Sequence, residues 1–228
     1  MSNFAIEPPH QPTLPIIGTD EVFPVRRVYC IGRNYAAHAV EMGHDPDKED
    51  PFFFQKNPDN LDTSGNFPYP PKSSDVHHEV EMAVMLGSGG RNISVQNALK
   101  CVYGYAASLD MTRRDLQGIQ KKLGRPWEIG KAFESSAPIG PVHRVSEVGH
   151  LDNGPITLKV NGESRQEGDL NQMIWKVQEQ ISYLSEHYEL APGDVILSGT
   201  PSGVAAVEKG DVMEVEISGL SKLTVVVS

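Results

Sequence analysis

From Val25 onward, the pattern of apolar and polar residues predicts a strand-rich domain. Apolar or alternating stretches predict strands over residues 25–32, 52–56, 77–87, 102–110 and, as a pair, 212–227. Residues 194–204 are expected to form a further strand that leads into a loop of small residues. Asn161 and Gly162 separate two further alternating runs, which is the signature of a β-hairpin. Strands outnumber helices and do not alternate with them regularly. The pattern therefore predicts an α+β fold rather than a doubly wound one.

Helical patterns are fewer. The longest runs over residues 170–188, with an apolar stripe of Met173, Val177, Ile181 and Leu184. A short helix over 34–43 follows an N-cap at Asn34, and another is expected near 94–100. Thr112 and Asp115 form a capping box, which predicts a helix over 112–124 with Arg114 and Gln117 on one face. Residues 124–141 carry too much Gly and Pro for a regular element, and residues 1–24 are expected to form a Pro-rich, extended arm.

Composition narrows the classes of partner. The chain of 228 residues has 20 basic and 30 acidic side chains, a formal charge of -10, which disfavours nucleic acid because that partner needs a basic face. A small anionic substrate is compatible with this net charge if a local cluster of cations binds it. No apolar run approaches the ~20 residues that cross a bilayer, and the first residues resemble no secretory signal, so we expect no membrane partner and a cytoplasmic protein.

Cys30 and Cys101 are far apart in the sequence, and each lies among apolar neighbours. No CxxC spacing for redox chemistry or zinc is present. We therefore expect both to be buried thiols.

Glu79 and Glu81 stand two positions apart in a strand, so both side chains point to the same face. Two ionised, partly buried carboxylates in that arrangement repel each other unless a cation compensates them. A divalent ion would do so, with Asp110 at the end of a later strand as a third oxygen ligand. Carboxylates alone favour Mg²⁺, Mn²⁺ or Ca²⁺ over zinc. The alternative is that the two glutamates lie on the solvent-exposed face of an edge strand.

His38 and Glu41 are spaced i, i+3 in the expected helix. A carboxylate one turn from an imidazole fixes its tautomer and raises its basicity, as a water-activating base requires. The alternative is an ordinary surface pair. Lys56, Arg114 and Lys131 are likewise candidate site residues or solvated cations, and the GTPSG segment is a candidate binding loop or a turn that lacks the lysine of a phosphate loop.

Seven blocks, taken together and in order, resemble the fumarylacetoacetate hydrolase family from about residue 25 to the end of the chain. They are IGRNYAAHAVEMG, FFFQK, HHEVEMAVMLG, YGYAASLDMTRRDLQ, PWEIGKAFESSAPIGP, LKVNGESRQEG and GDVILSGTPSGV. The resemblance implies one catalytic domain over 25–228 with a mixed β-sandwich roll, and a homodimer. The arm over 1–24 lies outside the match.

The resemblance also implies roles. Glu79, Glu81 and Asp110 match ligands of Mg²⁺ or Mn²⁺, for which Ca²⁺ can substitute; His38, Glu41 and Lys131 match catalytic positions; Arg114, Gln117, Thr200 and Lys56 match substrate contacts. The GRNYAxH and LDMTRRDLQ blocks are most similar to members that hydrolyse acylpyruvates.

The implied reaction is metal-dependent hydrolysis of the carbon–carbon bond of a small 2-oxo acid. The best candidate substrate is fumarylpyruvate, which would give fumarate and pyruvate in gentisate-type aromatic catabolism. Decarboxylation of oxaloacetate, or isomerisation or decarboxylation of a 2-oxo-dienoate, is the alternative on the same metal site. A non-catalytic, metal-stabilised binding protein is a more remote alternative, because a fold does not fix a function.

Overall fold

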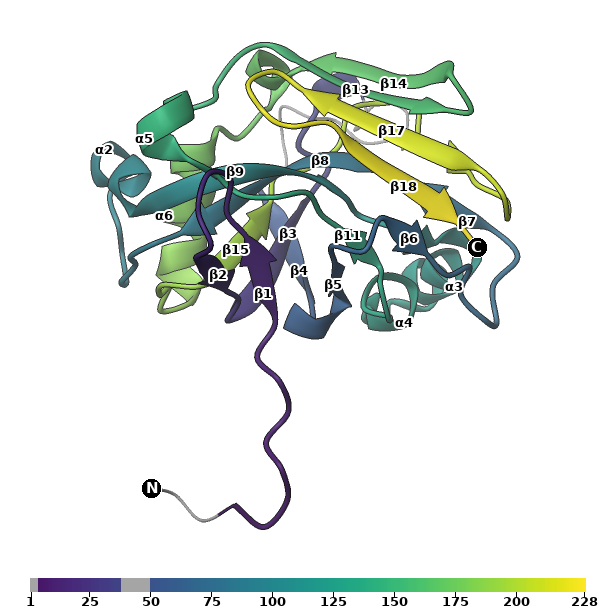
Figure 1. The fold of residues 1–228 in the computed structure, drawn as a ribbon, viewed down its shortest axis with the longest axis horizontal. Coiled ribbons are helices and arrows are strands. Elements are labelled where there is room, and N and C mark those ends of the chain that lie inside the picture. Colours follow the sequence, from purple (N-terminus) through teal and green to yellow (C-terminus); the bar gives the residue numbers. More distant parts are fainter. Residues whose placement is uncertain (1–3, 38–49) are drawn as a thin grey trace.

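Two β-sheets packed face to face form the body of the molecule (Figure 1). The computed structural model describes residues 4–37 and 50–228. The larger sheet has six strands in the order β12-β9-β8-β15-β3-β4, and the smaller has five in the order β14-β13-β17-β18-β6. In the larger sheet β15 pairs parallel with β3 and antiparallel with β8, so the sheet is mixed. The predicted strand-rich α+β class is confirmed.

The strand bounds follow the sequence pattern closely. The larger sheet consists of β3 (Arg27–Gly32), β4 (Phe52–Lys56), β8 (Val80–Leu86), β9 (Val102–Leu109), β12 (His143–Arg144) and β15 (Asp194–Leu197). The smaller consists of β6 (Asn66–Phe67), β13 (Pro155–Val160), β14 (Glu163–Asp169), β17 (Val212–Ile217) and β18 (Leu223–Val227). Short strands elsewhere are β1 (Thr13–Pro15), β2 (Val22–Pro24), β5 (Leu61–Asp62), β7 (Val76–His78), β10 (Thr112–Arg113), β11 (Ala137–Pro138) and β16 (Ala205–Ala206).

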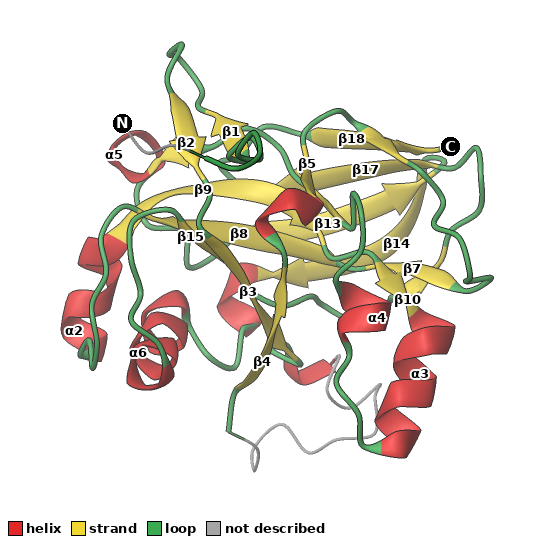
Figure 2. Ribbon diagram, turned by 90° about the horizontal axis from the view of Figure 1, so that it is seen from below, coloured by secondary structure: helices red, strands yellow, loops and turns green. Residues whose placement is uncertain are grey.

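The helices lie at the periphery of the sheets (Figure 2). They are α2 (Val95–Ala98), α3 (Arg114–Leu123), α4 (Glu128–Lys131), α5 (Val145–Val148) and α6 (Val177–His187). In the part of the chain that the structure describes, no helix is long and apolar enough to span a membrane.

Strand β8 separates two hydrophobic cores. Its residues Val80, Met82, Val84 and Leu86 belong to the large core between the sheets, whereas Ala83 and Met85 belong to a smaller core on the opposite face. The whole strand is buried, between β9 and β15. The alternative of a wet edge strand is therefore wrong for this segment.

Residues 13–24 are not the uniformly extended arm that the proline content suggested. β1 and β2 pair antiparallel, and Leu14 and Phe23 are buried in the smaller core. The apolar residues between the prolines supply the contacts that the sequence pattern did not reveal. Cys30 and Cys101 are buried and free, as predicted.

The hairpin between β13 and β14 confirms the Asn-Gly prediction. Asn161 has φ +53° and Gly162 has φ +81°. Both residues are in the left-handed region that a two-residue hairpin turn requires, and Asn and Gly tolerate it best.

The predicted capping box at Thr112 is wrong. Helix α3 begins at Arg114, and Thr112 lies in β10, where its hydroxyl accepts a hydrogen bond from Lys131 Nζ at 2.6 Å. Asp115 accepts hydrogen bonds from Ser73 Oγ at 2.7 Å and from the backbone N–H of Ser74 at 3.1 Å. Thr112 thus caps no helix, and Asp115 accepts from Leu116 N in the first turn of α3 at 2.8 Å rather than from the backbone of Thr112.

The predicted long helix starts seven residues late. Residues 170–172 form a single 3-10 turn capped by Asp169, whose carboxylate accepts from Asn171 N at 2.9 Å. The Asn34 side-chain oxygen then accepts from Trp175 N at 2.7 Å, which holds the backbone away from a helix until α6 begins. The predicted apolar stripe is confirmed as buried.

Two other helical predictions have different outcomes. The helix expected over 34–43 is described only to residue 37, so most of it, including His38 and Glu41, lies outside the described residues. The segment 124–141, expected to be irregular, contains the short helix α4, which ends at Lys131.

Candidate active site

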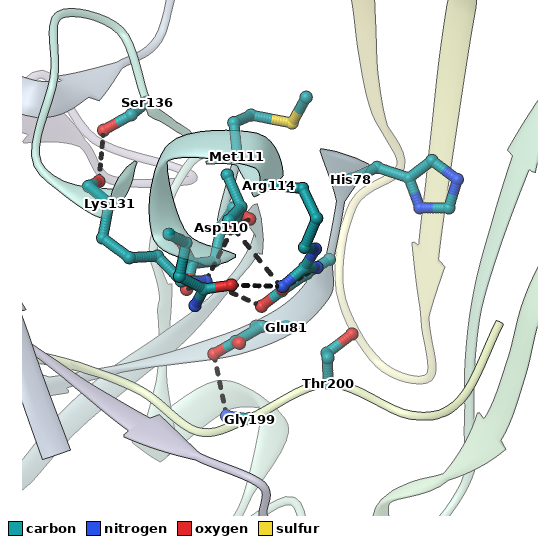
Figure 3. A network of polar contacts seen from close by, with 12 residues as sticks. His78, Glu81, Asp110, Met111, Arg114, Lys131, Ser136, Gly199 and Thr200 are labelled. Carbon is teal, nitrogen blue, oxygen red and sulfur yellow. Dashed lines mark hydrogen bonds and ion pairs between the residues drawn. The ribbon is translucent and has the colours of Figure 1, made fainter. Parts of the chain in front are cut away.

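Three carboxylates converge where the central strands of the larger sheet end (Figure 3). Glu79 lies between β7 and β8, Glu81 lies in β8, and Asp110 directly follows β9. The backbone N–H of Asp110 donates to the carbonyl of Glu79 at 2.8 Å, which continues the β8–β9 ladder. One carboxylate oxygen from each residue lies within 4.8 Å of the other two. The predicted convergence is confirmed.

Buried cations neutralise two of these carboxylates. Glu79 is 5% exposed and Asp110 is fully buried. Lys131 Nζ donates to Glu79 Oε2 at 2.9 Å and to Asp110 Oδ2 at 2.7 Å. Arg114 also pairs with Glu79, and Lys56 Nζ lies 2.9 Å from Asp110 Oδ1 as an ion pair outside hydrogen-bond geometry.

Glu81 is different, because no lysine or arginine of the described residues pairs with it. Its Oε2 accepts a hydrogen bond from the backbone N–H of Gly199 at 2.8 Å. Burial, reinforced by the charges of Asp110 and Glu79, raises the pKa of the Glu81 carboxyl well above its usual range. Glu81 is therefore the carboxylate of the triad that has no cationic side-chain partner among the described residues. A hard divalent cation fits this donor set and would supply that partner.

Lys56 and Lys131 are each only 2% exposed, so the alternative of solvated cations is wrong for both. Burial alone would lower the pKa of Lys131, but the charges of Asp110 and Glu79 outweigh it and raise this pKa, which keeps the ammonium protonated. Lys56 Nζ donates to the carbonyl of Lys131 and to Ser136 Oγ, the latter at 3.0 Å. Lys56 thus stabilises the backbone position of Lys131.

A pocket of about 420 Å³, counting its open mouth, lies beside the carboxylates. Arg114 and Gln117 line it from α3, where the Arg114 guanidinium donates to Gln117 Oε1 at 2.8 Å. Thr200 lines it from the loop that follows β15. Phe52 and Trp127 form an aromatic wall, with ring centroids 5.3 Å apart.

Two further, half-buried cations that sequence analysis missed line the pocket. Lys121 and Arg33 both line the pocket, and the Arg33 guanidinium stacks over the Phe52 ring at 4.9 Å. Lys121 follows Gln117 by four residues, so the α3 spacing alone would have placed it on the face that carries Arg114. The pattern offered no comparable signal for Arg33.

Not every predicted site residue can be placed. Lys56, Lys131 and the three carboxylates form one cluster, with Arg114, Gln117 and Thr200 around the pocket beside it. His38 and Glu41 lie outside the described residues, so their predicted pairing and position stay predictions.

A buried carboxylate triad that needs a cation, with charged lysines beside an open pocket, is the arrangement of a metal-dependent enzyme. Residues 27–228 match the family model described as fumarylacetoacetate (FAA) hydrolase C-terminal. The chain belongs to the fumarylacetoacetate hydrolase family.

Individual relatives carry different activities. A crystal structure of fumarylpyruvate hydrolase from Pseudomonas aeruginosa, in complex with Mn²⁺ and pyruvate, is 50% identical, has a TM-score of 0.97 and covers 99% of both chains. Fumarylpyruvate hydrolase of Ralstonia sp is 40% identical over 82% of this chain and 98% of its own. The mitochondrial oxaloacetate decarboxylase of Dictyostelium discoideum is 41% identical over 86% of this chain and 90% of its own. The chain is thus an enzyme of this family with its fold, and the buried triad is a candidate divalent-metal site.

Proposed function

We propose that this enzyme hydrolyses the carbon–carbon bond of an acylpyruvate, with fumarylpyruvate as the best candidate substrate and aromatic catabolism of the gentisate type as the setting. One observation carries the proposal. The carboxylate triad lines a pocket that further, half-buried cations also line, namely Arg33 and Lys121. The 50% identical relative whose structure holds Mn²⁺ and pyruvate supports a 2-oxo acid at the inner end.

The charge balance of the cluster favours a dianionic ligand. The three carboxylates are matched in number by Lys56, Lys131 and Arg114, so their formal charges cancel. A bound divalent ion leaves the cluster with an excess of two positive charges. Buried charges are stable only when they are compensated, and an acylpyruvate with a distal carboxylate carries the two negative charges required.

Glu79, Glu81 and Asp110 would hold Mg²⁺ or Mn²⁺. When bound, this ion supplies a Lewis acid that polarises the 2-oxo acid and stabilises a leaving enolate. Thr200 would donate its hydroxyl proton to the carboxylate of the 2-oxo acid. Lys131, which is protonated and buried, would offset negative charge that develops on the substrate oxygens.

Hydrolysis needs a base that activates water, and we assign that role to His38, with Glu41 as the residue that orients it. His38 would remove a proton from water, and the hydroxide would attack the acyl carbonyl to give a tetrahedral oxyanion. Collapse of this intermediate breaks the carbon–carbon bond, releasing the carboxylic acid and the enolate of pyruvate, which a proton then converts to pyruvate. Arg114 and Gln117 would contact the substrate on the side of the acyl group.

Oxaloacetate chemistry is the second candidate, because the Dictyostelium relative at 41% identity is an oxaloacetate decarboxylase. Decarboxylation also yields an enolate but requires no attacking water. We expect the Mn²⁺-loaded protein to release pyruvate faster from fumarylpyruvate than from acetylpyruvate or oxaloacetate, measured as kcat/KM at one enzyme concentration. Faster pyruvate release from oxaloacetate would instead identify a decarboxylase. No turnover of any of these substrates would favour a binding protein.

The Lys121→Met variant tests whether Lys121 contacts the distal carboxylate of the substrate. Lys121 lines the pocket, and its ammonium lies 5.8 Å from the centroid of the Trp127 ring. We expect KM for fumarylpyruvate to rise roughly fivefold, as for a partly exposed charge pair, while KM for acetylpyruvate, which lacks the distal carboxylate, stays unchanged.

Lys122→Met is the matched control, because Lys122 is the next residue of α3, is exposed and does not line the pocket. It removes the same charge and should change neither KM. An equal rise of both KM values in Lys121→Met would argue against contact with a distal carboxylate.

A homodimer, a cytoplasmic location and the preference between Mg²⁺ and Mn²⁺ are further parts of this proposal. They rest on the family resemblance and on the chemistry of oxygen ligands.

A further inference from the structure

The loop that carries Thr200 is pressed against the second sheet. Gly203, with φ +95°, has no room for a side chain, because an added Cβ would lie 2.2 Å from the carbonyl oxygen of Arg165 in β14. A strand of the smaller sheet thus touches the loop that lines the active site. Gln166 lies at this contact and is fully buried.

Backbone groups fix the orientation of the Gln166 amide. Its Oε1 lies 3.0 Å from the N–H of Val80, which can only donate, and its Nε2 lies 2.8 Å from the carbonyl of Pro201, which can only accept. The assignment of oxygen and nitrogen is therefore unambiguous. His78 Nδ1, at 2.9 Å from the same Oε1, must also donate to it.

The second Gln166 Nε2 proton is directed at the Thr200 hydroxyl oxygen, at 2.8 Å. Thr200 Oγ1 is thus an acceptor in this contact, and its own proton has to go elsewhere. No described residue accepts that proton, and Thr200 lines the pocket. In Figure 3 the His78 ring points away from the carboxylates.

We infer that Gln166 is a positioning residue, which turns the Thr200 hydroxyl into a proton donor aimed at the ligand. A carboxylate oxygen is the group that such a donor binds best, and a hydrogen bond to a charged acceptor is stronger than one between neutral groups. This inference rests on the proposed role of Thr200 in binding the carboxylate of a 2-oxo acid. It extends the site to a residue that does not line the pocket.

Gln166→Glu reverses the donor pattern with little change of shape. The introduced carboxyl group would accept from Val80 N and His78 Nδ1 through one oxygen. Its other oxygen would carry the proton that burial favours, donate it to the Pro201 carbonyl, and accept from the Thr200 hydroxyl. The Thr200 hydroxyl would then donate its proton to the side chain at position 166 and not to the ligand. We expect the affinity for pyruvate to fall on the order of tenfold, the loss typical of one hydrogen bond to a charged group.

The experiment is a double-mutant cycle with pyruvate as the probe. Calorimetry on Mn²⁺-loaded protein gives the dissociation constant for the wild type, Gln166→Glu, Thr200→Val and the double variant. If Gln166 acts through Thr200, each single variant binds pyruvate more weakly and the double variant binds no more weakly than Thr200→Val. Thr200→Ser keeps the hydroxyl and should bind pyruvate more tightly than Thr200→Val does.

Unchanged pyruvate affinity in Gln166→Glu, or a double variant whose loss is the product of the two single losses, overturns the inference. If circular dichroism shows that Gln166→Glu does not fold, Gln166→Met replaces it in the same cycle, since it removes the donor at similar length. In turnover the loss should appear in KM for fumarylpyruvate rather than in kcat. A wild type that binds pyruvate but hydrolyses no acylpyruvate contradicts the proposed function and leaves this inference standing.

Discussion

The His38→Gln variant should lose hydrolysis of fumarylpyruvate by about a hundredfold or more, the usual contribution of a positioned general base. Glutamine can form hydrogen bonds but cannot take the proton from water. The loss should appear in kcat, because metal and pyruvate binding are assigned to other residues. Release of pyruvate from acylpyruvate at saturating Mn²⁺ measures the effect.

His10→Gln is the control, since His10 is exposed in the N-terminal segment. It should leave kcat unchanged. Hydrolysis that persists within a few-fold of wild type in His38→Gln, at matched metal, would remove His38 from the mechanism. The residue would then be better explained as an ordinary surface histidine.

The Glu81→Gln variant should lose metal-dependent turnover altogether. Glu81 is the carboxylate of the triad whose charge the described cations leave unpaired, so its loss removes most of the attraction for a divalent ion. We expect Mn²⁺ affinity to fall by several orders of magnitude, and with it the rise in melting temperature that a tightly bound ligand produces.

The same variant should not be destabilised in the absence of metal. Burial raises the pKa of Glu81, which means that its ionised form is disfavoured in the fold, and a neutral amide avoids this cost. Glu186→Gln removes an equal charge at an exposed position and should keep both turnover and the Mn²⁺-dependent rise in melting temperature. Retained Mn²⁺ affinity in Glu81→Gln, by titration calorimetry, would exclude Glu81 as a ligand.

The carboxylate triad was predictable because the spacing of Glu79 and Glu81 and the place of Asp110 after its strand are local features of the sequence. A regular ladder then brings the ends of adjacent strands together. The start of the long helix was predicted too early in the chain because contacts between residues distant in sequence decide it. Asn34 lies far from residues 174–175 in sequence, and its hydrogen bonds there override the helical pattern.

The roles of the buried lysines were harder to predict. The sequence places Lys56 near the end of a strand, but its contact with the carbonyl of Lys131 joins segments that no local pattern connects. The same holds for Gln166, which reaches Thr200 across the two sheets. Residues that hold other residues in place leave no periodic signal, because their partners are distant in sequence.

The placement of the three carboxylates on the central ladder also bears on how the enzyme loses its metal. Glu81 and Asp110 belong to β8 and to the end of β9, which are paired along their whole length and buried on both faces. These ligands cannot separate by a local fluctuation of a loop. Separation of the backbone positions of these two carboxylates would require disruption of the sheet itself, so their spacing should persist as long as the slowest-exchanging amide protons of the protein.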